Sequence, residues 1–150
     1  MELRVVVIDI WRGKAYLPVQ ARYETGGSMD VEPVYMANLT AEELIVAMEK
    51  VLAAGHPRLP ALTREEIRHR ADPVLKATSA RTWKELSQTG ASYVIGWSDK
   101  ETRIDMSRLD KKGRWEYDLA KTRILPSEAP LKDIAVIIMD DIRSRPEVWQ

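Results

Sequence analysis

The chain has 150 residues, of which 45% are hydrophobic and 31% are charged, and its 23 basic residues balance its 23 acidic ones. This length and composition fit one globular domain, residues 1–150, with enough apolar residues for a real core. A net charge of zero argues against a general nucleic-acid-binding protein, which is usually basic. The absence of cysteine excludes disulfides and zinc–thiolate sites. No run approaches the roughly 18 apolar residues of a membrane span, and we expect a cytoplasmic protein that does not contact the membrane.

The first third of the sequence predicts a three-stranded antiparallel meander. The β-branched run within Leu3–Trp11 is typical of a central strand that is buried on both faces. A turn then leads to strands over Ala15–Tyr23 and Met29–Met36. Pro18 lacks an amide donor, so the second strand is expected either at a sheet edge or with a bulge.

Asp9 is an unusual residue inside the first predicted strand. Buried charges are normally paired, so the simpler interpretation is a strand-end carboxylate that pairs with a neighbouring Arg or Lys. The alternative is a carboxylate that belongs to a functional site.

Three Thr-x-x-Glu sequences predict helix N-termini, because the two side chains of a capping box satisfy orphan backbone donors. They begin at Thr40, Thr63 and Thr82. The first helix carries an apolar stripe over residues 44–52 and ends at Gly55. The second covers about residues 64–71 and ends before Pro73.

The third helix is short, with Trp83 and Leu86 as expected core contacts and Gly90 at its end. Apolar residues at helical spacing predict a last helix from Leu131 to about Arg143. Its adjacent acids, Asp140 and Asp141, are expected to form a solvated edge of that helix.

Alternating residues between Ser92 and Asp118 predict a second three-stranded meander. One dry face is expected to collect Tyr93, Ile95, Trp97, Ile104, Met106, Trp115 and Tyr117. Residues 121–126 follow as an extension or a further short strand. The whole order predicts an α+β fold, in which two three-stranded meanders build one or more antiparallel sheets with packed helices. The pattern does not decide whether the meanders share one sheet.

No motif predicts a catalytic residue, a cofactor or a metal site. His56 and His69 have no ligand or nucleophile–base spacing and are interpreted as ordinary surface residues. Asp110-Lys111-Lys112 has the acid–x–Lys form found in metal-dependent nucleases, with Asp99, Glu101 and Asp105 nearby. A nuclease or other hydrolase using these hairpin carboxylates therefore stays open as an alternative, as does a self-associating structural subunit.

Three segments resemble the immunity proteins of bacterial contact-dependent growth inhibition (CDI) systems. They are SARTWKELSQTGASYVIGW, RIDMSRLDKKGRWEYD and LPSEAPLKDIAVIIMDDIRSRP, within Ser79–Pro146. The resemblance implies a small cytoplasmic protein that binds the C-terminal domain of a cognate toxin, often a nuclease, and blocks its active site or substrate. It implies no catalytic residue and no direct contact with nucleic acid.

Charged residues of both signs between two predicted turns are the expected contacts with such a toxin, because complementary charge gives specificity. They are Asp99, Glu101, Arg103, Asp105, Arg108, Asp110, Lys111, Arg114 and Glu116. Reversing the charges of Asp105 and Glu116 together is expected to weaken toxin binding without disturbing the fold.

Overall fold

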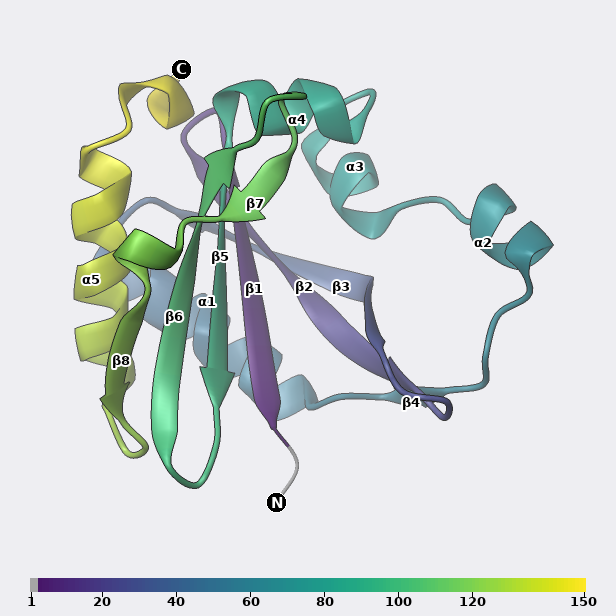
Figure 1. Cartoon of the computed structure of the whole chain (residues 1–150), viewed down its shortest axis with the longest axis horizontal. Helices are drawn as coiled ribbons and strands as arrows, with labels where there is room; N and C mark the ends of the chain where they lie inside the picture. Colours follow the sequence, from purple (N-terminus) through teal and green to yellow (C-terminus); the bar gives the residue numbers. More distant parts are fainter. Residues whose placement is uncertain (1–2) are drawn as a thin grey trace.

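A computed structural model describes residues 3–150, and its central feature is one eight-stranded sheet (Figure 1). The strand order is β3-β2-β1-β5-β6-β7, with β4 beside β2 and β8 beside β6. The strands are β1 Arg4–Trp11, β2 Lys14–Tyr23, β3 Ser28–Asn38, β4 Arg58–Leu59, β5 Ala91–Trp97, β6 Glu101–Leu109, β7 Trp115–Tyr117 and β8 Arg123–Pro126. Neighbouring strands are antiparallel except β4, which runs parallel to β2.

Both predicted meanders are present, and pairing of β1 with β5 joins them into a single sheet. The register runs from Arg4 opposite Trp97 to Ile10 opposite Ala91, so β1 is central, as its apolar sequence predicts. Strand β2 is also interior, and its register with β3 shifts between Pro18 and Val19. The bulge is therefore the correct alternative for Pro18, and the α+β fold class is confirmed.

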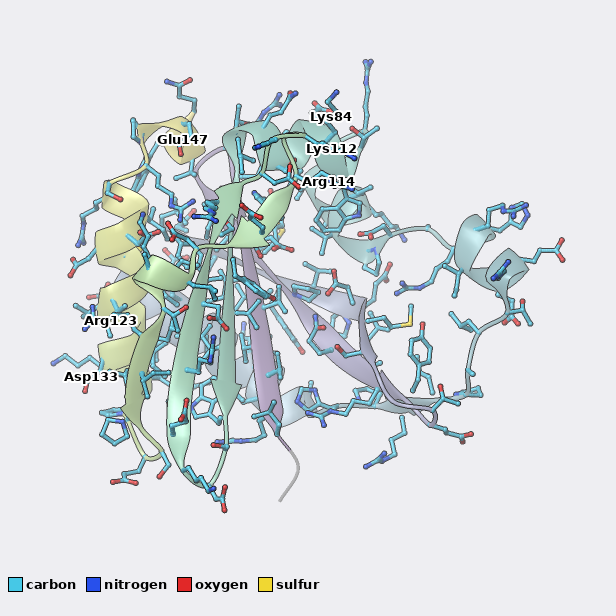
Figure 2. The ribbon with its side chains drawn as sticks, in the orientation of Figure 1. Lys84, Lys112, Arg114, Arg123, Asp133 and Glu147 are labelled. Atoms are coloured by element: carbon cyan, nitrogen blue, oxygen red, sulfur yellow. The ribbon has the colours of Figure 1, made fainter. Side chains whose placement is uncertain are left out.

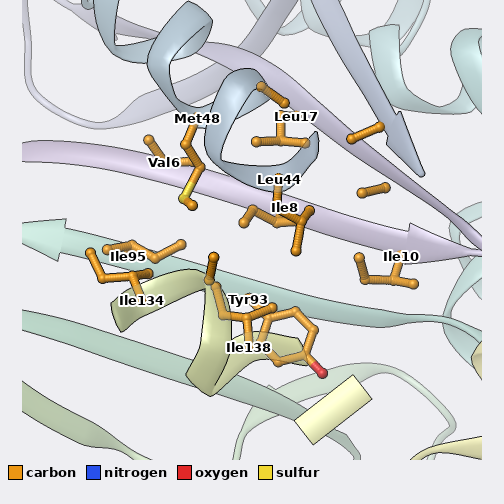
Figure 3. Packing of buried hydrophobic residues seen from close by; sticks show 14 of the residues in the cluster. Val6, Ile8, Ile10, Leu17, Leu44, Met48, Tyr93, Ile95, Ile134 and Ile138 are labelled. Atoms are coloured by element: carbon orange, nitrogen blue, oxygen red, sulfur yellow. The ribbon is translucent and has the colours of Figure 1, made fainter. Parts of the chain in front are cut away.

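The principal core lies between one face of the sheet and two helices, α1 Ala41–Ala54 and α5 Leu131–Arg143. Figure 3 shows Ile8 and Tyr93 of the sheet packed between Leu44 of α1 and Ile138 of α5, all of them fully buried. Burying one such side chain contributes roughly 1.5–3 kcal/mol, so this layer supplies most of the hydrophobic stabilisation.

A smaller core lies on the opposite face, where α3 Pro73–Thr78 and α4 Trp83–Thr89 cover one end of the sheet. It collects Trp11, Tyr16, Val74, Ala80 and Leu86. Helix α2, Arg64–His69, buries no residue. Figure 1 shows the other half of this face, below α3 and α4, without a covering helix from any of the residues that the structure describes.

The predicted helix starts are correct in position, but only one capping box is complete. Thr63 accepts a hydrogen bond from the Glu66 backbone, and Glu66 accepts one in return. Thr40 and Thr82 cap α1 and α4 in the same way. Their glutamates, however, accept from backbone N–H groups that precede the cap, at Asn38 and at Arg81.

Helix α2 ends at His69, close to its predicted end and before Pro73 as expected. Pro73 then begins α3 as its first residue, where its missing N–H costs nothing. Two predictions about the middle of the chain are wrong. Trp83 is 36% exposed, although Leu86 is fully buried as predicted. His56 is not an ordinary surface residue: its Nε2 accepts from the Val5 N–H at 3.1 Å and its Nδ1 lies 2.8 Å from the Gln20 carbonyl oxygen. The imidazole therefore bridges β1 and β2.

The last strand of the second meander faces the other way from the prediction. Tyr93, Ile104 and Met106 are buried under α5, but β6 and β7 pair Ser107 with Tyr117 and Leu109 with Trp115. Residues paired across neighbouring strands point to the same face of the sheet, whereas consecutive residues of one strand point to opposite faces. Ser107 follows Met106 directly, so Ser107 and its partner Tyr117 point to the face opposite that of Met106. Trp115 and Tyr117 consequently lie on the face opposite α5, and Tyr117 is 50% exposed.

Candidate partner-binding surface

The nine charged residues predicted as contacts lie along β6, β7 and the turns at both ends of β6. The nine residues of β6 extend over roughly 30 Å. Asp99 and Glu101 therefore lie at one end of the sheet, while Asp110, Lys111 and Arg114 lie at the other. The structure spreads the predicted charges along one edge region and does not bring them into one cluster.

Between these ends, the uncovered half of the sheet presents an apolar strip. Val5, Val7 and Val94 are half-buried although they belong to central strands, and Ile124 of β8 is 53% exposed. The registers of β1, β5, β6 and β8 place these side chains on the same face as Tyr117. We call this set, Val5, Val7, Val94, Tyr117 and Ile124, the open strip.

Two of the predicted charges lie within the open strip, on β6 between its β5 and β8 members, and are held by contacts of their own. Arg103 lies opposite Gly96 and Ile124, and Asp105 lies opposite Val94. Arg103 Nε lies 3.1 Å from Asp105, which also accepts a hydrogen bond from the Thr122 hydroxyl at 2.9 Å. The Asp105 side chain is only 14% exposed, so reversing its charge would disturb the contact with the segment before β8. The expectation that this substitution leaves the fold intact does not fit these contacts.

The other predicted charges are also largely paired within the protein. Arg108 bonds Glu116 across the β6–β7 pair at 2.9 Å, and Arg114 Nε lies 3.3 Å from Asp110. Exposed pairs of this kind stabilise by roughly 0–1 kcal/mol, so a partner can replace them at small cost.

Asp110 has a structural role that its acid–x–Lys sequence does not reveal. Its carboxylate accepts hydrogen bonds from the backbone N–H groups of Arg114 and Lys112, at 2.9 and 2.8 Å, and so closes the β6–β7 turn. These bonds hold the pKa of Asp110 below its usual range. Within residues 3–150, no three His, Asp or Glu side chains lie together in an arrangement that could hold a metal ion.

Next to this turn lies a groove that sequence reasoning missed, because Trp83 and Trp115 were both assigned to the core. It has a volume of about 420 Å³ and is lined by Trp83, Lys84, Ser87, Lys112, Arg114 and Trp115. We call it the tryptophan groove. The two indole rings meet edge to face, with centroids 6.0 Å apart. The only sequence signal for it is the basic run that flanks Trp115.

A crevice of about 320 Å³ lies between the open strip and the tryptophan groove and is lined by Ser92, Ser107, Trp115, Glu116 and Tyr117. Beneath it, Asp9 is buried and accepts a hydrogen bond from the Ser92 hydroxyl at 2.8 Å. Burial, and secondarily the negative charges of Asp30 and Asp72, raise the pKa of Asp9 to about 8. The simpler interpretation, that a nearby Arg or Lys pairs with Asp9, is wrong; the carboxyl group is largely neutral at pH 7.

Asp141 also departs from expectation, because it is not a solvated helix edge. Its carboxylate accepts hydrogen bonds from Tyr93 Oη at 2.5 Å, Arg145 Nε at 2.8 Å and Lys121 Nζ at 3.1 Å, and its side chain is 8% exposed. Burial alone would raise the pKa of Asp141, but these partners outweigh it and hold the pKa below its usual range. Its neighbour Asp140 is exposed and pairs only with Arg143.

No protein-family model matches the sequence, and no curated protein matches it. The fold is nevertheless shared with solved structures. A protein of unknown function from Neisseria meningitidis aligns over 95% of both chains, with a TM-score of 0.66 and 13% identity. A chain of a CdiA-CT/CdiI toxin and immunity complex from Yersinia pseudotuberculosis aligns over 97% of this chain and 98% of that chain, with a TM-score of 0.66 and 13% identity.

These similarities show that the chain shares its fold with both structures. The second structure comes from a toxin and immunity complex of the kind that the sequence resemblance names. The structural alignment also covers the first half of this chain, which the sequence resemblance did not include. Among residues 3–150, no helix is both long and apolar enough to cross a membrane.

Proposed function

We propose that this protein is an immunity protein that binds the C-terminal toxin domain of a CDI system and neutralises it in the cytoplasm, without catalysing a reaction. The observation that carries the proposal is the open strip, a largely apolar surface that runs from β1 and β5 to β7 and β8 and that no helix within residues 3–150 covers. The fold shared with a chain of a toxin and immunity complex supports it.

The chemistry of the open strip fits a protein partner. Protein interfaces combine an apolar centre with a polar rim, and tyrosine is enriched among their contacts. Here Val5, Val7 and Val94 form an apolar patch on β1 and β5. Arg103 and Asp105 of β6 lie next to this patch, with Ile124 on their other side, and Tyr117 follows at the β7 end. A β-sheet backed by a packed core is already rigid, so binding costs little ordering entropy. A partner seated on this surface would have its active site or its substrate surface covered.

The test first asks whether the reading frame directly upstream encodes a large secreted protein with a variable C-terminal domain, and that domain is then produced as the toxin with and without this protein. The proposal expects that co-expression restores growth and that calorimetry detects a complex with the purified toxin domain. Gel filtration of the protein alone establishes whether the surface instead pairs two copies. Unrestored growth together with no detectable complex would refute the proposal.

A matched pair of substitutions locates the interface. Ile124→Glu places a charge in the open strip, while Val136→Glu places the same charge on the outer surface of α5, where Val136 is 44% exposed. Because a charge buried at an interface without a partner is costly, Ile124→Glu is expected to weaken toxin binding at least about tenfold. Val136→Glu is expected to leave binding unchanged. Equal affinities for the two variants would place the interface elsewhere.

A further inference from the structure

We propose that the tryptophan groove binds an acidic polypeptide segment that packs an apolar anchor side chain against the indole rings of Trp83 and Trp115. Resting on the proposed function, we further infer that the toxin domain supplies this segment. Arg114, one of the predicted contacts, lines the groove, and the crevice lined by Trp115 and Tyr117 connects the groove to the open strip.

The walls of the groove are fixed before any partner binds. The Ser87 hydroxyl donates a hydrogen bond to the Gly113 carbonyl at 2.8 Å, which ties α4 to the β6–β7 turn. Trp83 Nε1 donates to Asp72 at 3.0 Å, which fixes the orientation of that indole. Gly90 lets α4 approach the sheet, because a Cβ atom there would lie 2.5 Å from the Ile10 and Leu86 carbonyl oxygens. A rigid aromatic cleft loses little conformational entropy when it receives a side chain.

The rim of the groove is positively charged. Figure 2 shows Lys84, Lys112 and Arg114 gathered at one end of the molecule, beside α4 and the β6–β7 turn. No acidic side chain lines the groove. Arg114 pairs with Asp110, whereas Lys84 and Lys112 have no ion-pair partner among residues 3–150. Two free ammonium groups above an apolar floor complement carboxylates that flank an apolar residue.

The surroundings favour a polypeptide over a nucleic-acid strand. A strand needs a continuous basic track with successive stacking platforms. Here Asp72 contacts Trp83, Glu85 follows Lys84, and Asp110 contacts Arg114, so carboxylates outside the groove limit the basic rim to a short length. One apolar side chain with a few flanking acids fits this short, bounded rim.

The first experiment uses a short synthetic peptide of glutamates around a single central leucine, with a lysine-for-glutamate version as control. Indole N–H signals of isotope-labelled protein, assigned with Trp83→Phe and Trp115→Phe, report binding. We expect the acidic peptide to shift the signals of Trp83 and Trp115, to bind more weakly at high salt, and to leave in place the signal of Trp97, which is buried at the far end of β5 from α4. The basic peptide is expected not to bind.

Two variants and a matched control complete this experiment. The double variant Lys84→Glu, Lys112→Glu and the single variant Trp83→Ala are each expected to lower peptide affinity at least about tenfold, since aromatic anchors and desolvated charges dominate such contacts. Lys100→Glu combined with Lys132→Glu makes the same charge change at exposed positions on the β5–β6 turn and on α5. This control is expected to keep wild-type affinity, and circular dichroism confirms that each variant is folded.

Failure of the acidic peptide to bind, or equal affinity for the groove variants and the control, would overturn the proposal. Tighter binding of a single-stranded oligonucleotide that Trp83→Ala abolishes would also overturn it, in favour of nucleic acid. Calorimetry with the upstream-encoded toxin domain tests the source of the segment. If both groove variants bind the toxin domain with wild-type affinity, the toxin domain does not supply the acidic segment. Absence of toxin binding to the wild type would instead refute the proposed function, while the peptide result stands independently.

Discussion

Replacing Asp9 by asparagine should remove a pH dependence from the stability of this protein. The amide oxygen can still accept the hydrogen bond from the Ser92 hydroxyl, but the side chain can no longer ionise. In the wild type, the pKa of Asp9 rises from an ordinary 3.8 to about 8 because the carboxyl is buried, with the charges of Asp30 and Asp72 adding to the effect. The folded protein therefore holds a proton that the unfolded chain releases.

The sign and the size of the effect follow from this difference in proton binding. Between about pH 4 and pH 8, the folded state carries more bound protons than the unfolded state, so the free energy of unfolding falls as pH rises. The fall approaches about 1.4 kcal/mol per pH unit and accumulates to on the order of 4 kcal/mol by pH 7. Above about pH 8 the carboxyl is ionised in both states and the stability changes no further through this group.

Denaturant unfolding of the wild type and Asp9→Asn, repeated at intervals from pH 5 to pH 9, measures this difference. The amide's extra donor adds a constant cost, so the two slopes against pH are compared, not the absolute stabilities. We expect the gap between the two curves to widen in favour of the variant as pH rises. Asp99→Asn, on the exposed β5–β6 turn, is the control and should run parallel to the wild type. Parallel curves for Asp9→Asn as well would show that Asp9 is ionised in the folded protein.

Three further substitutions test contacts that hold the fold. Asp141→Ala removes the shared hydrogen-bond acceptor of Tyr93, Lys121 and Arg145, so it should lower the free energy of unfolding by about 3 kcal/mol near pH 7. The control Asp140→Ala, at an exposed position, should lower it by less than about 0.5 kcal/mol. Because the pKa of Asp141 is lowered, this stabilisation is present above about pH 4, and urea titrations should show the loss shrinking in acid. His56→Ala removes the bridge between β1 and β2 and should lower the unfolding free energy by about 1–2 kcal/mol, whereas exposed His69→Ala should not change it. Gly90→Ala forces a methyl group against two backbone carbonyls and should lower the thermal midpoint through a loss of about 1–3 kcal/mol; an unchanged midpoint would show that α4 can shift.

The open strip and the tryptophan groove are neighbouring surfaces that favour different chemical features in a partner. The strip is broad and largely apolar, and the two charges within it, Arg103 and Asp105, already pair with each other, so it favours a partner of complementary shape over one of complementary charge. The groove is small and its lysines are unpaired, so it favours an acidic partner. A partner that contacts both would gain specificity from the groove and area from the strip.

Local features of the sequence determined the elements of this fold. Threonines with a glutamate three residues later marked three helix starts, and the apolar spacing of residues 131–143 identified α5, because capping and helical periodicity act within a few residues. Alternation located both meanders for the same reason. Alternation also shows which residues of one strand share a face, but it carries no information on which face becomes the interior.

Tertiary pairing decided the rest. The register of β7 on β6 turned Trp115 and Tyr117 away from the core predicted for them, and the pairing of β1 with β5 made one sheet from two meanders. Asp141 became buried because Tyr93, 48 positions earlier in the chain, points its hydroxyl at the end of α5. The candidate surface likewise exists only because α3 and α4 cover half of one sheet face and leave the other half open. Such contacts join residues far apart in the chain, and a local sequence pattern does not specify which distant segment will pack against it.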